Sequence, residues 1–563
     1  MRVLRRGGLT LIMNYMQMKR QKKTEPLRNI IIITLISFYV LIVVISAWLS
    51  DDAYITFRTV DNFINGFGLT WNVSERVQVY THPLWMFILS AFYFITREIY
   101  FTSITISILI SIGAVILLFY KLSNSITNTI FIGLILIFSK AYIDYSTSGL
   151  ENPLTHLLIV VFFIFYFKDE VKGSKLFNLS LIASLAVLNR MDIVLIFLPA
   201  LLVIYFRGNK WKGLLIAAAG FSPFILWEIF SLFYYGFPFP NTAYAKLNTG
   251  ISQIELIQQG FHYLLYSFYL DPLTPIVLLA GIIIPLVSKN RTLLPLTIGI
   301  ACYMIYILII GGDFMGGRFF SAPLLCSAIV ISKTNFISIR FRHTQIAIIL
   351  TIIMLGLLSP KPTIFSTANY GLGPKIFKAF RFGPYIVNMY HGITDQRNWY
   401  YYFTGLLSNV SERKLYEFVG IPDALQLRES GKRVVIKGVI GMIGFYSGSN
   451  VHIVDRLALS DPLLSKLPST EYWRIGHKPR PNEKKWLIGH FTRKIPVGYL
   501  ETITTGENKL QDKNLRKYYD KISLVTRGNL FDFNRLIEIW NLNTGKYDHL
   551  LKTYNNISLQ NSN

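Results

Sequence analysis

Long apolar stretches without a charged residue recur along the first 360 residues of the chain. The first covers residues 29–50, and its 22 residues would rise about 33 Å as a helix, enough to cross a bilayer. A cleavable signal peptide is the competing interpretation, but its apolar core would be shorter, about 7–15 residues. Ten further stretches cover 101–120, 122–139, 154–167, 176–189, 193–206, 213–227, 272–288, 292–312, 319–332 and 345–360. The pattern predicts a polytopic α-helical membrane protein with about 11 spans.

One apolar stretch differs from the others. Residues 83–96 begin at Pro83 and are followed directly by Arg97. We expect this stretch to lie in the membrane interface, although a crossing stays open.

Basic residues mark every second connector between the predicted spans. These are Lys121; Lys168, Lys172 and Lys175; Arg207, Lys210 and Lys212; Lys289 and Arg291; and Lys333, Arg340 and Arg342. Residues 1–28 are also basic. Since basic loops remain in the cytoplasm, the N-terminus is expected inside. An odd number of crossings then places residues 361–563 outside.

The C-terminal region, residues 361–563, is too polar for the membrane and long enough to bury a core of its own. Residues 434–448 and 451–454 resemble buried strands bounded by Gly and Ser. We therefore expect an α/β or α+β extracytoplasmic domain after a basic N-terminus (1–28) and a transmembrane domain (29–360).

Composition supports a membrane protein. Hydrophobic residues make up 52% of the chain and charged residues only 15%, against about 25% in soluble domains. The net charge of +25 would suggest nucleic acid in a soluble chain, but much of the excess lies in the connectors, so no nucleic-acid partner is expected. No P-loop, dinucleotide fingerprint, zinc pattern or hydrolase elbow is present.

Two adjacent carboxylates, Asp51 and Asp52, follow the first predicted span directly. One interpretation is a solvated span end. The other is a general base for a hydroxyl nucleophile, in which the neighbouring acid raises the pKa of the base.

The remaining candidate residues also fall on the predicted outer side. His82 is a hydrogen-bonding or acid–base candidate, and Trp71 and Trp85 suit membrane anchoring or sugar stacking. Glu151 suits a helix N-terminus or a catalytic role, and Arg190 and Asp192 suit mutual pairing or a supporting role.

Two cations are candidates for holding a phosphate. Lys246 is a basic residue on the side where such residues are fewer. Arg318 ends the glycine-rich stretch 311–318, and its forked donor suits phosphate. The alternative for Arg318 is a salt bridge to Asp313 that only fastens the loop.

An ordered set of motifs carries a resemblance to a known family. The motifs are Asp51-Asp-Ala-Tyr-Ile-Thr-Phe-Arg58, Gly66-Phe-Gly-Leu-Thr-Trp-Asn72, Tyr80-Thr-His-Pro-Leu-Trp85, Thr147-Ser-Gly-Leu-Glu151, Pro240-Asn-Thr-Ala-Tyr-Ala-Lys246, Gly311-Gly-Asp-Phe-Met-Gly-Gly-Arg318 and, further on, Gly441-Met-Ile-Gly-Phe-Tyr446 and Ile488-Gly-His-Phe491. Together they resemble GT-C membrane glycosyltransferases, in particular the terminal β-arabinofuranosyltransferase type of mycobacteria and its bacterial relatives. The resemblance covers most of residues 29–550.

The resemblance implies a bacterial inner-membrane enzyme that transfers a sugar from a polyprenyl-phosphate donor to a cell-envelope glycan, with inversion. Asp51 is the first choice for the base and Asp52 the alternate, while Glu151 would stabilise positive charge at the sugar. Lys246 and Arg318 would contact the donor phosphate, and the supporting residues would be Arg58, His82, Arg190, Asp192 and Asp313. No cofactor is required, and a divalent cation at the acid pair stays open.

Gly316 and Phe319 depart from the family pattern, in which a Pro and a second Arg are usual, and Met191 stands where Pro is common. Two other classes of function are alternatives. A transporter or flippase of lipid-linked sugars would need acids along a midplane path, and the apolar stretches are nearly free of charge. A non-catalytic envelope or flagellar assembly factor would leave the acid pair without a use.

Overall fold

A computed structural model describes residues 25–123, 125–169, 171–288, 290–334, 342–365, 378–382, 385–431, 433–470, 486–552 and 554. The predicted basic N-terminus up to residue 24 and much of the connector 333–342 lie outside these residues.

Each predicted apolar stretch forms a helix. The first is Glu25–Ser46. The others are α3 (Pro83–Thr96), α4 (Ile99–Leu117) with its π-helical extension η1 (Leu118–Leu122), α5 (Ile126–Phe138), α7 (Asn152–Phe167), α8 (Lys172–Asn189), α9 (Val194–Phe206), α10 (Lys210–Gly220), α11 (Ser222–Tyr234), α14 (Leu273–Val287), α15 (Leu294–Ile309), α16 (Ser321–Ser332) and α17 (Arg342–Leu357). The helical nature of these stretches is therefore confirmed.

The number of spans stays a prediction. Two helices among the described residues are long and apolar enough to cross a membrane alone, Glu25–Ser46 and Ile99–Leu122. Two pairs meet the same test only together, α10 with α11 and helix α13 (Gln253–Leu270) with α14, bent by 61° and 115°. The remaining apolar helices are shorter, with 10–17 residues each.

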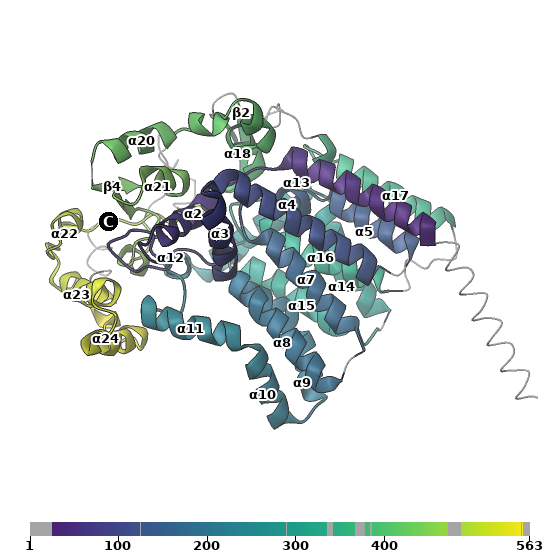
Figure 1. Ribbon diagram of the computed structural model, residues 1–563, viewed down its shortest axis with the longest axis horizontal. Coiled ribbons are helices and arrows are strands. Elements are labelled where there is room, and N and C mark those ends of the chain that lie inside the picture. Colours follow the sequence, from purple (N-terminus) through teal and green to yellow (C-terminus); the bar gives the residue numbers. More distant parts are fainter. Residues whose placement is uncertain are drawn as a thin grey trace, which may run out of the picture.

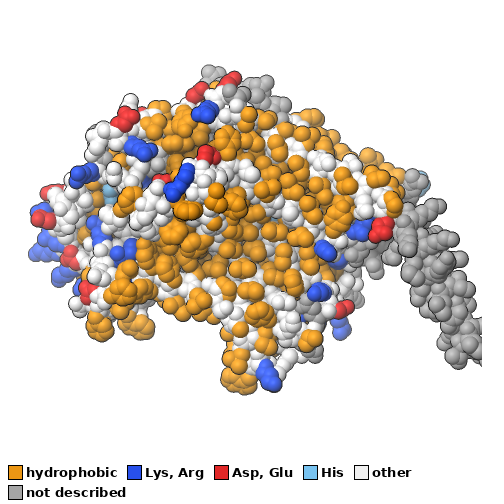
Figure 2. Space-filling model, viewed as in Figure 1, with side chains coloured by type: hydrophobic (Ala, Val, Ile, Leu, Met, Phe, Trp, Pro, Cys, Tyr) orange, Lys and Arg blue, Asp and Glu red, His pale blue; other side chains and the backbone are white. Residues whose placement is uncertain are grey.

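These helices pack side by side into one bundle (Figure 1). Helix α9 packs against α15, α14 against α16, and α7 against both α4 and α8. Figure 2 shows hydrophobic side chains covering the visible face of the bundle, while charged side chains gather mainly over the C-terminal helices. An apolar face of this kind suits an apolar solvent.

Several segments predicted as outer loops contain helices. Helix α2 (Asp51–Ile64) follows the first span, α6 (Lys140–Asp144) precedes α7, and α12 (Asn241–Leu247) and α13 lie between α11 and α14. Helix α13 was not among the predicted apolar stretches, and its buried residues include Gly260, Tyr263, Ser267 and Leu270. Residues 256–270 contain no Asp, Glu, Lys or Arg, but Gln258, Gln259 and His262 make them less apolar than the predicted spans.

The C-terminal region contains two small sheets. Strands β1 (Lys378–Phe382), β2 (Tyr385–Tyr390) and β3 (Ile393–Thr394) are antiparallel, whereas β4 (Val434–Lys437) and β5 (His452–Asp455) are parallel. Its other elements are α18 (Gln396–Thr404), α19 (Leu406–Ser411), η5 (Lys414–Glu417), α20 (Ile421–Glu429), α21 (Gly441–Ser447), η6 (Leu464–Lys466), α22 (Tyr499–Thr505), α23 (Lys513–Arg527) and α24 (Phe533–Asn543).

The expected strand over 434–448 is corrected by the structure. Only 434–437 is a strand, and 441–447 forms helix α21, which connects β4 to its parallel neighbour β5. Parallel strands need a crossover, and the short helix supplies it. Helix α21 packs on both α2 and α20 and so joins the first outer segment to the C-terminal region (Figure 1).

Candidate active site

Helix α2 places the two adjacent acids at its first turn. Ser50 caps the helix, since its side chain accepts a hydrogen bond from the Ala53 amide, and Asp51 and Asp52 follow where negative charge suits the helix dipole. Successive residues on a helix point about 100° apart, so the two carboxylates face different surroundings.

Asp51 is buried against helix α21. Its carboxylate oxygens accept hydrogen bonds from the backbone N–H groups of Gly441 at 3.1 Å and Met442 at 2.8 Å. Burial, reinforced by the Asp52 charge and opposed by the two amide donors, raises the pKa of Asp51 to about 7. Asp51 therefore holds α2 to the C-terminal region.

Asp52 has no such partner. It is partly buried, and within the described residues its carboxylate makes no hydrogen bond or ion pair. Burial raises the pKa of Asp52, while the positive charges of Arg318 and Lys246 oppose that rise and the negative charges of Asp313 and Glu151 reinforce it. Asp52 is thus the acid that faces both candidate phosphate ligands.

Glu151 is the centre of a buried charge cluster. Arg318 Nη2 lies 3.1 Å from Oε1 and 3.2 Å from Oε2, and Arg190 Nη1 lies 3.0 Å from Oε1. Burial alone would raise the pKa of Glu151, but Arg318, His82 and Arg190 outweigh it and hold that pKa well below its usual range. Glu151 therefore remains a carboxylate. Its expected place at a helix N-terminus is confirmed, since Glu151 is the N-cap residue of α7, although its side chain makes no cap hydrogen bond.

The predicted pair of Arg190 and Asp192 is present. Arg190 Nε and Nη2 donate to the two carboxylate oxygens of Asp192 at 2.7 and 2.9 Å, and the guanidinium lies 4.4 Å from the centre of the Phe319 ring. Because Arg190 reaches Glu151 as well, the pair belongs to the cluster and is not an isolated bridge.

His82 connects the cluster to helix α2. Its Nε2 lies 2.8 Å from Thr56 Oγ1 and its Nδ1 3.4 Å from Glu151 Oε2. Burial lowers the pKa of His82 to about 4, with Arg318 and Arg190 adding to the effect and Glu151 opposing it. The ring is therefore neutral near pH 7. It supplies hydrogen bonds rather than charge.

The glycine-rich loop brings Arg318 to Glu151. Gly312 and Gly317 have φ of +71° and +80°, and a Cβ on Gly312 would lie 2.5 Å from the Tyr263 ring, so glycine is needed there. Tyr263 in turn donates to the Met315 carbonyl and accepts from the Phe319 amide. The Asp313–Arg318 bridge exists at 3.6 Å, longer than the contacts from Arg318 to Glu151.

Lys246 is the free cation of the site. It lies in the last turn of α12, is exposed, and makes no hydrogen bond or ion pair within the described residues. Its charge nevertheless acts on Asp52.

Arg58, Trp71 and Trp85 lie in the core. The Arg58 guanidinium donates to the backbone carbonyls of Trp71, Gly444 and Val451 at 2.6–2.8 Å and covers the Trp71 ring. The Trp85 indole donates to the Gly149 carbonyl. Both tryptophans are fully buried, so they neither stack on sugars nor anchor in the membrane. Arg58 supports the fold, because it joins three backbone carbonyls from distant parts of the chain.

Thr56, Tyr263 and Tyr303 position the charged residues and the loop of the site, and the sequence did not predict them as site residues. Thr56 lies one helical turn after Asp52, so helical spacing offered a signal for it. The tyrosines had none, since Tyr303 meets Asp192 only through tertiary packing. Among the described residues no three His, Cys, Asp or Glu side chains are grouped as a metal site.

Comparisons with known proteins were made on sequence and on structure. No family model matches the chain. The chain is similar to the terminal beta-(1->2)-arabinofuranosyltransferase of Mycobacterium tuberculosis, with 23% identity over 562 residues that cover 82% of this chain and 86% of the relative. It is similar to the enzyme of the same name from Corynebacterium glutamicum, with 24% identity over 335 residues, 51% of this chain and 48% of the relative.

A crystal structure of ArnT from Cupriavidus metallidurans bound to undecaprenyl phosphate aligns with 76% of this chain and 86% of its own, at 10% identity and a TM-score of 0.42. The similarity in sequence is the finding that bears on the family resemblance. It confirms the resemblance to terminal β-arabinofuranosyltransferases that the ordered motifs predict.

Proposed function

We propose that the protein is a glycosyltransferase that moves a sugar from a polyprenyl-phosphate donor to a glycan acceptor on the outer face of the bacterial inner membrane. The observation that supports it best is the position of Asp52, an unpaired acid next to two cations. The relatives' name adds a pentofuranose as the first sugar to test. The proposal includes the predicted topology, with about 11 spans and an extracytoplasmic C-terminal region.

Asp52 is the base in this proposal, in preference to Asp51. Both oxygens of Asp51 already accept backbone hydrogen bonds, whereas Asp52 has free lone pairs. A raised pKa brings a carboxylate closer to the working pH and makes it a stronger base.

The reaction is a single displacement. The acceptor hydroxyl oxygen bonds to the anomeric carbon as the bond from that carbon to the phosphate oxygen breaks, and Asp52 takes the hydroxyl proton. The electron pair leaves with the polyprenyl phosphate, whose charge Lys246 meets directly. Attack from the face opposite the leaving group inverts the anomeric centre.

The cluster around Glu151 gives this site fixed charges. Glu151 stays ionised, holds Arg318 and Arg190 in place, and offers negative charge to the oxocarbenium-like sugar. Fixed charges in a site of low polarity stabilise a transition state without reorganisation.

The test of the base compares two isosteric variants. Asp52→Asn should lower transfer from lipid-linked sugar about 10²–10⁴-fold, the usual contribution of a general base. Asp51→Asn should retain more activity, because its role is to dock α21. Wild-type turnover by purified Asp52→Asn would overturn the assignment.

The donor phosphate is tested by titration of lipid phosphate into variants at the two cations. Lys246→Gln should weaken donor binding by about 1.5–3 kcal/mol, the range for charged hydrogen bonds. Arg318→Lys should also weaken it, because Lys lacks the forked guanidinium that contacts Glu151 through Nη2 and Asp313 through Nη1. The double variant should lose less than the sum if both cations serve one phosphate. Unaltered affinity in all three variants would remove both residues from the donor site.

A further inference from the structure

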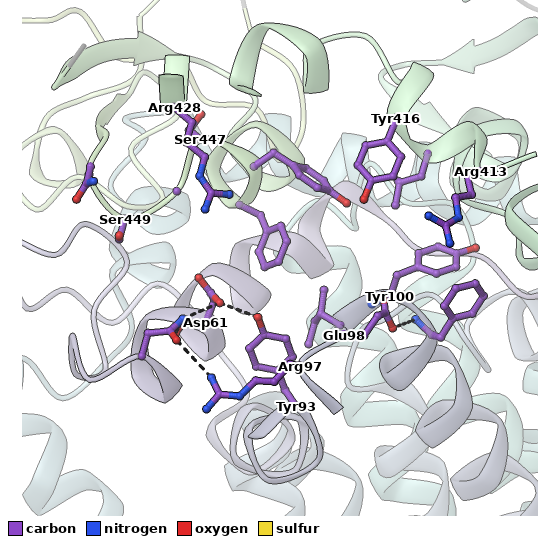
Figure 3. A pocket seen from close by; sticks show the side chains of 18 of the residues that line it. Asp61, Tyr93, Arg97, Glu98, Tyr100, Arg413, Tyr416, Arg428, Ser447 and Ser449 are labelled. Carbon is purple, nitrogen blue, oxygen red and sulfur yellow. Dashed lines mark hydrogen bonds between the residues drawn. The ribbon is translucent and has the colours of Figure 1, made fainter. Parts of the chain in front are cut away.

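A cavity separate from the candidate active site lies between residues 61–101 and the C-terminal region. Its volume is about 560 Å³. One wall comes from α2 and the junction of α3 and α4, and the other from η5, α20 and α21 with the residues after it (Figure 3). None of the residues of the candidate active site lines it.

Helix α2 separates the two sites. Asp52 and Asp61 are nine residues apart, which in a helix means about 13 Å along the axis and half a turn around it. Asp61 lines the cavity, whereas Asp52 faces Arg318 and Lys246. The cavity therefore lies on the other side of α2.

The carboxylates of the cavity are already used within the protein. Glu98 accepts from the Tyr100 and Phe101 amides at 2.9 and 2.7 Å and so caps helix α4. Asp61 accepts from the Tyr93 hydroxyl at 2.7 Å and from the Asn65 amide at 2.9 Å. Donors within the protein therefore already satisfy both carboxylates.

The cations that line the cavity have few or no hydrogen-bond partners among the described residues. Arg413 and Arg428 are exposed, and within the described residues neither makes a hydrogen bond or an ion pair. Arg97 makes one bond, to Asn65 at 3.3 Å. Figure 3 shows Arg413 and Arg428 entering from the C-terminal wall and Arg97 from the opposite one. The charge offered to a ligand is positive.

Aromatic and small polar side chains complete the lining. Tyr100, Tyr416 and Tyr446 present rings, and Ser447, Ser449 and Asn450 present short hydrogen-bonding groups. Rings with hydroxyl and amide groups suit the apolar faces and hydroxyls of sugars, and free guanidinium groups suit carboxylate or phosphate.

We propose that this cavity binds an acidic saccharide, a sugar chain that carries carboxylate or phosphate groups. The inference goes beyond the proposed transfer reaction, because it concerns a site away from the reacting groups. The saccharide reaches it either as a free glycan or on a lipid, since exposed Phe94, Ile95 and Phe101 stand beside the cavity residues.

The test uses the purified full chain in detergent micelles and isothermal titration with trigalacturonate as the acidic probe and maltotriose as the uncharged one. Wild-type protein should bind trigalacturonate and not maltotriose. Arg413→Gln and Arg428→Gln should each weaken that binding about tenfold or more, as expected for loss of a charged hydrogen bond. Arg291→Gln removes the same charge from an exposed position in another part of the chain and should leave binding unchanged.

Three results would overturn the proposal. The first is that the wild type does not bind trigalacturonate. The second is that Arg291→Gln loses as much affinity for trigalacturonate as the two cavity variants. The third is that phosphatidylglycerol nanodiscs bind at this cavity and trigalacturonate does not. Asp52→Asn separates the two proposals, because it should lower transfer about 10²–10⁴-fold and leave trigalacturonate affinity intact.

Discussion

At the scale of single residues, adjacent carboxylates have taken on different environments. Asp51 points to backbone amides and Asp52 to cations, although the sequence places them side by side. Glu151 is a second example, because two arginines that are distant in the chain keep its side chain ionised. A carboxylate's function here depends on its partners more than on its position.

Asp51 makes stability depend on pH. Its pKa is raised from 3.8 to about 7, so the folded state binds the proton more tightly than the unfolded state. The stability from this group is fully present below about pH 4 and is lost as pH rises through about 7. Asp51→Asn does not titrate. The apparent melting temperature of wild type minus that of the variant should fall between these pH values, and a difference that rises would contradict the raised pKa.

At the scale of elements, α21 meets α2 through glycine. A Cβ on Gly441 would lie 1.9 Å from the Asp51 carbonyl oxygen and 2.5 Å from its Oδ2, and one on Gly444 would lie 2.7 Å from the Trp71 ring. Only residues without a side chain allow this approach. The close packing of α21 on α2 therefore explains why glycine stands at both ends of the Gly441-Met-Ile-Gly444 motif.

Gly441→Ala should separate α21 from α2. We expect the variant to lose about 2 kcal/mol or more of stability, since backbone must move to relieve the contact. Gly113→Ala in α4 is the control, because a Cβ there meets nothing within 4 Å. Thermal unfolding and limited proteolysis of the C-terminal region measure the effect. Equal stability of the two variants would show that α21 adapts without cost.

At the scale of the whole molecule, the C-terminal region is held to the bundle by buried charge and by backbone contacts. Lys140 of α6 contacts Asp395 at 3.1 Å, and Arg397 contacts Asp144 at 3.1 Å. Arg535 of α24 donates to the carbonyls of Phe233 and Tyr234. Such contacts place the C-terminal region on the side of the bundle where the candidate active site lies.

The predicted orientation follows from the basic connectors. A reporter that is active only outside the cytoplasm should be active when fused after Asn563, and one fused after Arg207 should be inactive. The Arg207 fusion is the matched control, since that connector is predicted to be cytoplasmic. An inactive Asn563 fusion beside an active Arg207 fusion would contradict the predicted orientation and would place the proposed site on the cytoplasmic face.

The sequence by itself determined the helices of the bundle, because a charge-free apolar run has few alternatives to a helix in an apolar solvent. It also predicted most of the charged residues of the candidate site, since polar groups beside apolar spans are costly without a use. The strand predicted over 434–448 was wrong beyond residue 437. The β propensity of Val434–Ile436 does not show that a helix begins a few residues later, at Gly441.

Only the tertiary structure decided which residues meet. Asp52 and Lys246 come from helices almost two hundred positions apart, and Glu151 and Arg318 from loops 167 positions apart. Side-chain direction and burial, which decide between Asp51 and Asp52 and remove Arg58, Trp71 and Trp85 from the site, arise from packing across the whole chain. A single sequence carries the residue types, but charge partners and desolvation exist only once distant segments are packed together.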